Sequence, residues 1–259
     1  MAARNIILIH GWACDESIWQ KTMDYLEPKH RVFNLNLPPM ENLLTYRDAV
    51  VELIEQKGLD EVILVGWSMG SLVAIQAAHQ LPHKIQGLVL VGGTCRFPAN
   101  RQSRTPAPGK EESFKEIYQS GIPPVLVARM KKRLSKDREQ TIKDFYQLMF
   151  SSQEHAWGLA GKIITAHLSR GRVWDTLEAQ AGLDYLKEAD VRAKLPAITC
   201  PTLLIHGEQD EICPLDGARF IHRQMPHAQL VSYPGIGHVP FLTNPAGFHQ
   251  ALEEWLSAL

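Results

Sequence analysis

The sequence predicts an α/β fold in which a mostly parallel, doubly wound sheet carries an inserted helical lid. Short apolar runs alternate with stretches of helical period in both end regions of the chain, which is typical of a parallel sheet covered by helices on both faces. Between these regions, from about residue 94 to residue 199, the sequence shows helical periodicity and no clear strand. We therefore expect an α/β core made of residues 1–94 and 200–259, and a helical lid (cap) made of residues 95–199.

The core elements are expected in the following order. Apolar runs predict strands over residues 5–9, 31–37, 61–66, 86–92, 202–206 and 229–233. Amphipathic stretches predict helices over residues 15–26, 46–57, 69–80, 217–224 and 248–259. Pro38 ends the second strand, and Gly58 and Pro82 stop the second and third helices. A loop rich in proline and charged residues, over residues 98–109, opens the lid.

Composition excludes several classes of protein. The 27 Lys and Arg residues nearly balance the 28 Asp and Glu residues, and the net charge of −1 argues against nucleic acid as a main partner. No apolar run approaches the roughly 20 residues that cross a bilayer, and the amino terminus shows no signal-peptide pattern. The four cysteines form no Cys-x-x-Cys pair. We expect a cytoplasmic protein without a membrane span, metal or cofactor.

A G-x-S-x-G motif, Gly66-Trp67-Ser68-Met69-Gly70, stands between the third strand and the third helix. A sharp strand–turn–helix lifts the serine hydroxyl above the sheet, and the flanking glycines leave room for neighbouring backbone. Because an apolar strand precedes the motif and a helix of small residues follows it, Ser68 is predicted to be a nucleophile.

A serine hydroxyl needs a base that removes its proton and an acid that orients the base. Asp210 follows the fifth strand and His238 follows the sixth, so both are expected at the edge of the sheet where sites form. Asp216 and Glu208 are weaker candidates for the acid. His10 and His206 end strands and are expected to support loops by hydrogen bonds.

Acyl transfer also needs N–H donors for the oxyanion. The expected donors are the backbone N–H of Met69 and that of Trp12, in the loop after the first strand. The indole of Trp12 forms either a wall of the substrate pocket or a contact with the lid.

At these residues the chain resembles the α/β-hydrolase superfamily and, within it, the pimeloyl-[acyl-carrier-protein] methyl ester esterase family of biotin synthesis. The resemblance rests on His10-Gly11-Trp12, Gly66-Trp67-Ser68-Met69-Gly70, Gly237-His238 and a lid segment, Phe145-Tyr146-Gln147-Leu148-Met149. It implies that Trp12, Ser68, Met69, His238 and the five lid residues contact the substrate. It implies a serine carboxylesterase that acts on a small-alcohol ester of a medium-chain acyl group, with methyl pimeloyl-carrier ester as the best candidate.

Residues 129–143 carry seven basic side chains against two acidic ones, a local net charge of +5. Because acyl-carrier proteins are acidic, this basic rim is expected to steer one to the pocket mouth, although a solvated helix face is the simpler interpretation. The rim consists of Arg129, Lys131, Lys132, Arg133, Lys136, Arg138 and Lys143.

Two other functions are also compatible with these residues. A thioesterase, lactonase or C–C hydrolase would share the Ser–His–Asp residues and differ in the lid. A ligand-sensing protein could keep the same residues and signal through movement of the lid.

Overall fold

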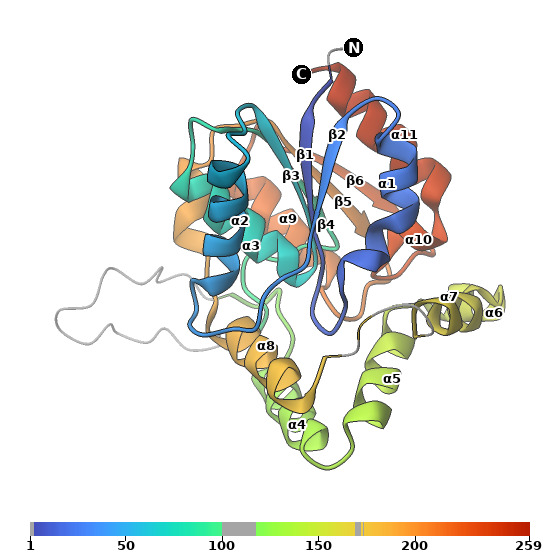
Figure 1. Ribbon diagram of the computed structural model, residues 1–259. Helices are drawn as coiled ribbons and strands as arrows, with labels where there is room; N and C mark the ends of the chain where they lie inside the picture. The colour runs from blue at the N-terminus through green and yellow to red at the C-terminus, as the bar shows by residue number, and fades with distance from the viewer. Residues whose placement is uncertain (1–2, 100–117, 169–171, 173) are drawn as a thin grey trace.

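The computed structural model describes residues 3–99, 118–168, 172 and 174–259 (Figure 1). Its centre is one sheet of six strands in the order β2-β1-β3-β4-β5-β6, and every neighbouring pair is parallel. The strands are β1 (Asn5–Ile9), β2 (Arg31–Leu35), β3 (Val62–Trp67), β4 (Ile85–Val91), β5 (Thr202–Gly207) and β6 (Gln229–Tyr233). Strands β3 and β5 are buried throughout, as the continuous apolar runs require.

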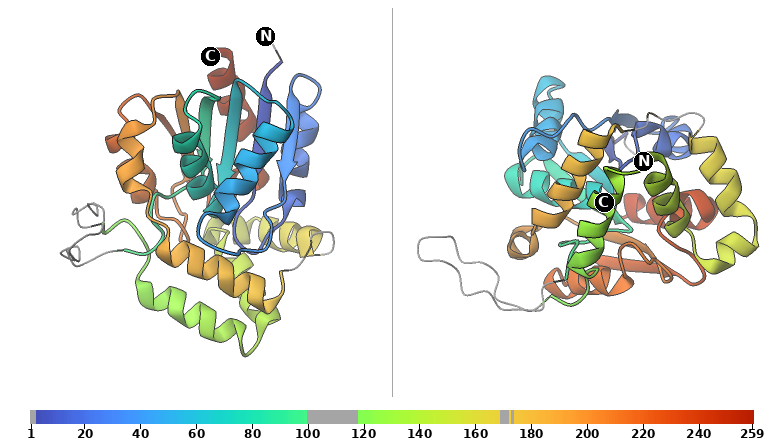
Figure 2. Two further views of the ribbon diagram at one scale, coloured as in Figure 1. Left: turned by 60° about the vertical axis from the view of Figure 1, so that its left-hand side comes forward. Right: turned by 90° about the horizontal axis from the view of Figure 1, so that it is seen from below.

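Helices cover both faces of the sheet, which confirms the predicted fold class (Figures 1 and 2). One face carries η1 (Glu16–Trp19), α1 (Gln20–Leu26), α10 (Pro240–Thr243) and α11 (Pro245–Ser257). The other face carries α2 (Thr45–Gln56), α3 (Met69–Gln80) and α9 (Leu215–Gln224). The 3₁₀ helix η2 (Arg192–Ala197) packs beside α3 and α9 before β5 begins.

Among the described residues, five α-helices between β4 and β5 lie below the carboxyl ends of the strands in Figure 1, and we call them the lid. They are α4 (Pro124–Leu134), α5 (Arg138–Leu148), α6 (Ser152–Ala156), α7 (Leu159–Leu168) and α8 (Thr176–Glu188). Helix α4 packs on α5 and α8, and α7 packs on α5 and α6. From residue 100 onward, the predicted loop over residues 98–109 lies outside the described residues. No helix in the described ranges is long and apolar enough to cross a membrane.

Several elements differ from the sequence predictions by one or more residues, and three of the differences have a local cause. The second strand ends at Leu35 because the chain leaves the sheet there, and the N–H of Leu37 donates to Nε2 of His10 instead. The first helix starts as the 3₁₀ turn η1, capped by Asp15. The last helix begins at Pro245, whose fixed φ suits the first helical position, and not at Phe248.

Candidate active site

Ser68 lies on the sharp turn between β3 and α3, in a strained backbone conformation with φ 55° and ψ −119°. The flanking glycines permit this turn. A Cβ on Gly66 would lie 2.4 Å from the carbonyl oxygen of Gly70, and a Cβ on Gly70 would lie 2.4 Å from that of Ile9. No larger residue fits either position without moving backbone, so the motif has the steric cause that the sequence predicts.

Asp210 and His238 are brought together at the carboxyl edge of the sheet. Nδ1 of His238 lies 2.6 Å from Oδ2 of Asp210, and both side chains are buried. Oδ1 of Asp210 accepts the N–H groups of Ile212 and Cys213, at 2.9 and 2.8 Å. Since the carboxylate can only accept, Nδ1 of His238 carries the proton, and Nε2 is left with a free lone pair.

The charge state of Asp210 follows from its neighbours. Burial alone would raise the pKa of this carboxyl group, but attraction to the His238 ring when it is protonated, together with hydrogen bonds from His206 and His238, holds that pKa well below its usual range. Asp210 is therefore an anion at neutral pH and can stabilise a protonated His238.

The second ring nitrogen of His238, Nε2, is buried and is left without a hydrogen-bond partner among the described residues. The ring of His238 lies 5.3 Å from that of Trp67, the residue before Ser68, and the indole N–H of Trp67 donates to the carbonyl of His238 at 2.9 Å. Hydrogen bonds between a serine and its base often tighten only when substrate binds.

Cys213 adjoins both Ser68 and Asp210. Burial and the charge of Asp210 raise the pKa of the Cys213 thiol well above its usual range, and a hydrogen bond from Ser68 acts in the opposite direction. The thiol stays protonated and unreactive at neutral pH.

Of the two predicted oxyanion donors, Met69 is the first residue of α3, where N–H groups of the first turn have no partner within the helix. Trp12 lies in the loop after β1, and its indole is attached to the lid. The indole N–H donates to the carbonyl of Ala179 in α8 at 2.8 Å, and the ring meets that of Phe145 in α5 at 4.7 Å. Of the two roles left open for this indole, the structure shows the lid contact.

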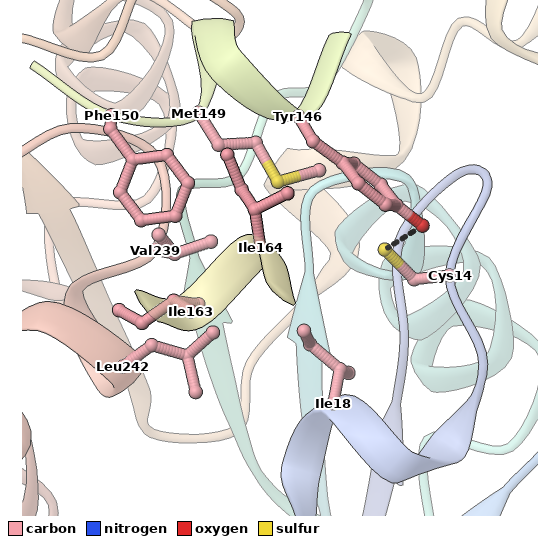
Figure 3. Close-up of a pocket in the computed structure, with 9 residues that line it drawn as sticks. All are labelled: Cys14, Ile18, Tyr146, Met149, Phe150, Ile163, Ile164, Val239 and Leu242. Atoms are coloured by element: carbon pink, nitrogen blue, oxygen red, sulfur yellow. Dashed lines mark hydrogen bonds between the residues drawn. The ribbon is translucent and has the colours of Figure 1, made fainter. Parts of the chain in front are cut away.

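A narrow apolar cavity lies under the lid, next to the loop that carries His238 (Figure 3). Its free volume is about 10 Å³, the lower limit for a single water molecule. Three of its lining residues also border an open groove of about 540 Å³ beside α1: Ile18, Ile163 and Leu242. The remaining lining residues are Cys14, Tyr146, Met149, Phe150, Ile164 and Val239.

The five lid residues implied by the resemblance have different surroundings. Tyr146 and Met149 line the cavity (Figure 3), and Phe145 packs on Trp12. Gln147 and Leu148 are exposed, Leu148 at 50%. Successive residues of a helix point about 100° apart, so five in a row cannot all face one cavity.

Tyr146 also connects the lid to the loop after β1. Its hydroxyl donates to the carbonyl of Ala13, which itself adopts a positive φ of 55°. Burial raises the pKa of Tyr146 well above its usual range, so the hydroxyl remains a donor.

The basic rim lies on α4, α5 and their connection. Three of its members have carboxylate neighbours: Lys131 pairs with Asp184 at 2.6 Å, Arg133 pairs with Asp144, and Arg138 lies 3.9 Å from Glu139. The other four are exposed and form no ion pair with any described residue: Arg129, Lys132, Lys136 and Lys143.

The sequence gives no indication that His206 lies next to Asp210. His206 donates through Nε2 to the carbonyl of Cys213 at 2.6 Å, which confirms the expected loop support, and the same nitrogen lies 3.4 Å from Oδ2 of Asp210. His10 likewise supports its loop, with Nδ1 2.9 Å from the carbonyl of Gly11. Within the described residues, no cluster of three or more His, Cys, Asp and Glu could hold a metal ion.

The family model of the alpha/beta hydrolase fold matches residues 4–245. The chain is 32% identical over 249 residues to the pimeloyl-[acyl-carrier protein] methyl ester esterase of Nitrosomonas europaea, covering 94% of this chain and 92% of that protein. It is 28% identical to the protein of the same name from Yersinia enterocolitica, covering 97% and 92%.

Solved structures show the same fold at lower identity. The esterase EaEST from Exiguobacterium antarcticum superimposes with a TM-score of 0.82 at 22% identity, covering 99% of this chain and 92% of that one. A bromoperoxidase from Bacillus anthracis superimposes with a TM-score of 0.83 at 19% identity, with the same coverage. At these identities the likeness concerns the fold alone.

Proposed function

Because the chain belongs to the α/β hydrolase family and to the carboxylic ester hydrolases within it, we propose that it removes the methyl group from pimeloyl-[acyl-carrier protein] methyl ester in biotin synthesis. The observation that supports this most strongly is the buried Asp210–His238 pair, in which Nε2 has no partner among the described residues and the His238 ring lies 5.3 Å from that of Trp67, the residue before the strained turn at Ser68. The similarity to esterases of that name over nearly the full chain supports the choice of substrate.

In the proposed mechanism, Oγ of Ser68 attacks the ester carbonyl carbon while Nε2 of His238 takes the hydroxyl proton. Asp210 holds the ring in the required tautomer and stabilises the imidazolium. The oxyanion of the tetrahedral intermediate accepts the N–H groups of Trp12 and Met69. When the intermediate collapses, the methoxide leaving group takes the proton from Nε2 of His238 and departs as methanol. Water then attacks the acyl-enzyme by the same route and releases the free carboxylate.

The acyl chain is proposed to occupy the cavity under the lid, in contact with Tyr146 and Met149. At about 10 Å³ the cavity is too small for any acyl chain, because this free volume is only the lower limit for one water molecule. Substrate must therefore displace lid side chains toward the neighbouring groove. Phe145 supports Trp12 in this proposal, and we assign no substrate contact to Gln147 or Leu148.

We propose that the rim docks the acidic carrier through the four basic residues that lack an ion pair. An exposed charge already paired with a carboxylate attracts a partner less, since its field is partly cancelled. Replacing Lys132, Lys136 and Lys143 together by glutamine should raise KM several-fold for the carrier-bound ester and leave KM for free dimethyl pimelate unchanged. Adding salt should remove most of the difference. Equal effects on both esters would refute docking at the rim.

The first test is the rate of methanol release from pimeloyl-[acyl-carrier protein] methyl ester, with Ser68→Ala as the blank. We expect turnover that disappears in the variant and exceeds turnover of a small aryl ester. Hydrolysis of the aryl ester through Ser68 without release from the carrier ester would preserve the mechanism and refute the substrate.

The four cysteines are free thiols, which supports a cytoplasmic location.

A further inference from the structure

The loop that carries His238 is held by the lid as well as by the sheet. The backbone N–H of His238 donates to the carbonyl of Met149 at 2.7 Å. Three residues earlier, the carbonyl of Gly235 accepts the hydroxyl of Ser151 at 2.6 Å. These contacts join residues more than 80 positions apart, so the segment that leads into α6 helps to hold the loop of His238, the proposed base.

Glu154 makes the third contact of this group. Its side chain is fully buried, and Oε2 accepts the N–H of Gly237 at 3.0 Å. The same oxygen accepts the N–H of Ser151 at 2.7 Å, which completes a capping box at the start of α6. A capping box needs only two local bonds, this one and the bond from the N–H of Glu154 to Oγ of Ser151 at 3.1 Å. The bond to Gly237, directly before His238 in the sequence, is an additional one that joins the helix to the catalytic loop.

Packing at Gly237 leaves little freedom for movement. A Cβ at this position would lie 2.5 Å from the carbonyl oxygen of Met149 and 2.9 Å from Oε2 of Glu154. Because the loop backbone lies directly against the carboxylate, displacing the carboxylate displaces Gly237 and the residue bonded to it. Apart from these lid contacts, Asp210 holds Nδ1 of the His238 ring and the indole of Trp67 holds the carbonyl of His238.

We propose that Glu154 is a positioning residue for the reaction, a lid carboxylate that fixes the loop of His238 so that Nε2 points at Ser68. The inference rests on the proposed function, since it takes His238 as the base. A buried N–H without an acceptor is unfavourable, so without the carboxylate the loop would shift to find other acceptors. A shift of about 1 Å in a catalytic group can lower the rate about 100-fold.

The test compares two substitutions at one site. Glu154→Gln keeps an oxygen that can accept both N–H groups, whereas Glu154→Met has a similar length and no such acceptor. We expect Glu154→Met to lower kcat for a free aryl ester about 10- to 100-fold with KM within about twofold, and Glu154→Gln to stay within about threefold of the parent. The low-field proton resonance of the His238–Asp210 hydrogen bond should persist in Glu154→Gln and be shifted or lost in Glu154→Met.

Glu178 offers a matched control because it completes the other capping box, at the start of α8, where its carboxylate accepts the N–H of Asp175. Glu178→Met should lower the melting temperature and leave kcat within about twofold. A folded Glu154→Met with parental kcat would overturn the proposal, as would an equal loss of kcat in Glu178→Met. If Glu154→Met does not fold, Ser151→Ala decides: a loss of kcat supports the role of the lid contacts, and parental kcat overturns it.

Failure of the proposed function would look different. Ser68→Ala and His238→Ala are measured on the same aryl ester. Retained hydrolysis in those two variants refutes the mechanism itself, whereas their inactivity combined with a fully active Glu154→Met refutes only the positioning role.

Discussion

Replacing Asp210 by asparagine tests the proposed chemistry at the atom on which it depends. In the parent, Oδ1 accepts two backbone N–H groups, so the oxygen of an asparagine side chain would keep that place. The NH₂ group would then replace Oδ2, 2.6 Å from Nδ1 of His238 and 3.4 Å from Nε2 of His206. A donor now faces Nδ1, so the ring must move its proton to Nε2, and the base is lost.

The expected loss follows from this change of tautomer. In a serine protease the equivalent substitution lowers kcat by about 10⁴, which corresponds to about 5.4 kcal/mol in the activation barrier. We expect a similar loss for Asp210→Asn, measured as release of p-nitrophenol from a short-chain ester with Ser68→Ala as the baseline. Circular dichroism would verify that the variant is folded.

Two nearby carboxylates serve as controls. Glu208 accepts the hydroxyl of Ser232 at 2.8 Å, and Asp216 pairs with Arg219 at 3.0 Å on the surface. Glu208→Gln and Asp216→Asn should therefore keep kcat within about twofold. The reasoning is refuted if Asp210→Asn retains more than about a tenth of parental kcat, or if either control loses as much as Asp210→Asn.

Three further predictions concern stability and the lid. Gly66→Ala should lower Tm sharply or prevent folding, because its Cβ would lie 2.4 Å from a backbone oxygen. Gly161→Ala in α7 meets nothing within 4 Å and should raise the free energy of unfolding by about 0.5–1 kcal/mol. Thermal unfolding of both variants tests this, and equal effects on Tm would contradict the steric account. The pKa of Asp210 is depressed in the folded state, so its charge stabilises the fold above the unfolded-state pKa of about 3.9, and this contribution is lost as the pH falls through the folded pKa. The difference in Tm between the parent and Asp210→Asn should accordingly narrow below about pH 4, and a constant difference would contradict the assignment. Tyr146→Phe should lower the free energy of unfolding in urea by about 1 kcal/mol, because the carbonyl of Ala13 loses its donor. It should also lower kcat, because the loop that carries Trp12 becomes less firmly held. An unchanged kcat would show that this contact is structural only.

Local sequence predicts the parts of the site that depend on local sterics. The turn at Ser68 needs glycine two positions before and two positions after it, and the five consecutive residues 66–70 meet this requirement. Asp210 and His238 could be selected because parallel strands end at one edge of the sheet, so chain order alone brings the residues after β5 and β6 together. The predicted strands differ from the observed ones by only one or two residues at their ends.

The lid could not be predicted to the same depth. Helical periodicity shows which side of a helix is apolar, but not which partner covers that side. The contact of Trp12 with Ala179 joins residues 167 positions apart, and that of Glu154 with Gly237 joins residues 83 positions apart. Ion pairing of the rim is a further example, since Asp184, the partner of Lys131, lies on α8, outside the basic segment.

The sequence by itself therefore determined the fold class, the strained turn at Ser68 and the choice of Asp210 and His238, because strand order and close backbone approach leave clear local patterns. Only the tertiary structure decided that the lid holds the loops of Trp12 and His238 and that the cavity beneath it has almost no free volume. The physical reason is that buried hydrogen bonds and side-chain packing depend on which surfaces meet when the chain folds. The sequence of one segment does not reveal which distant segment will pack against it.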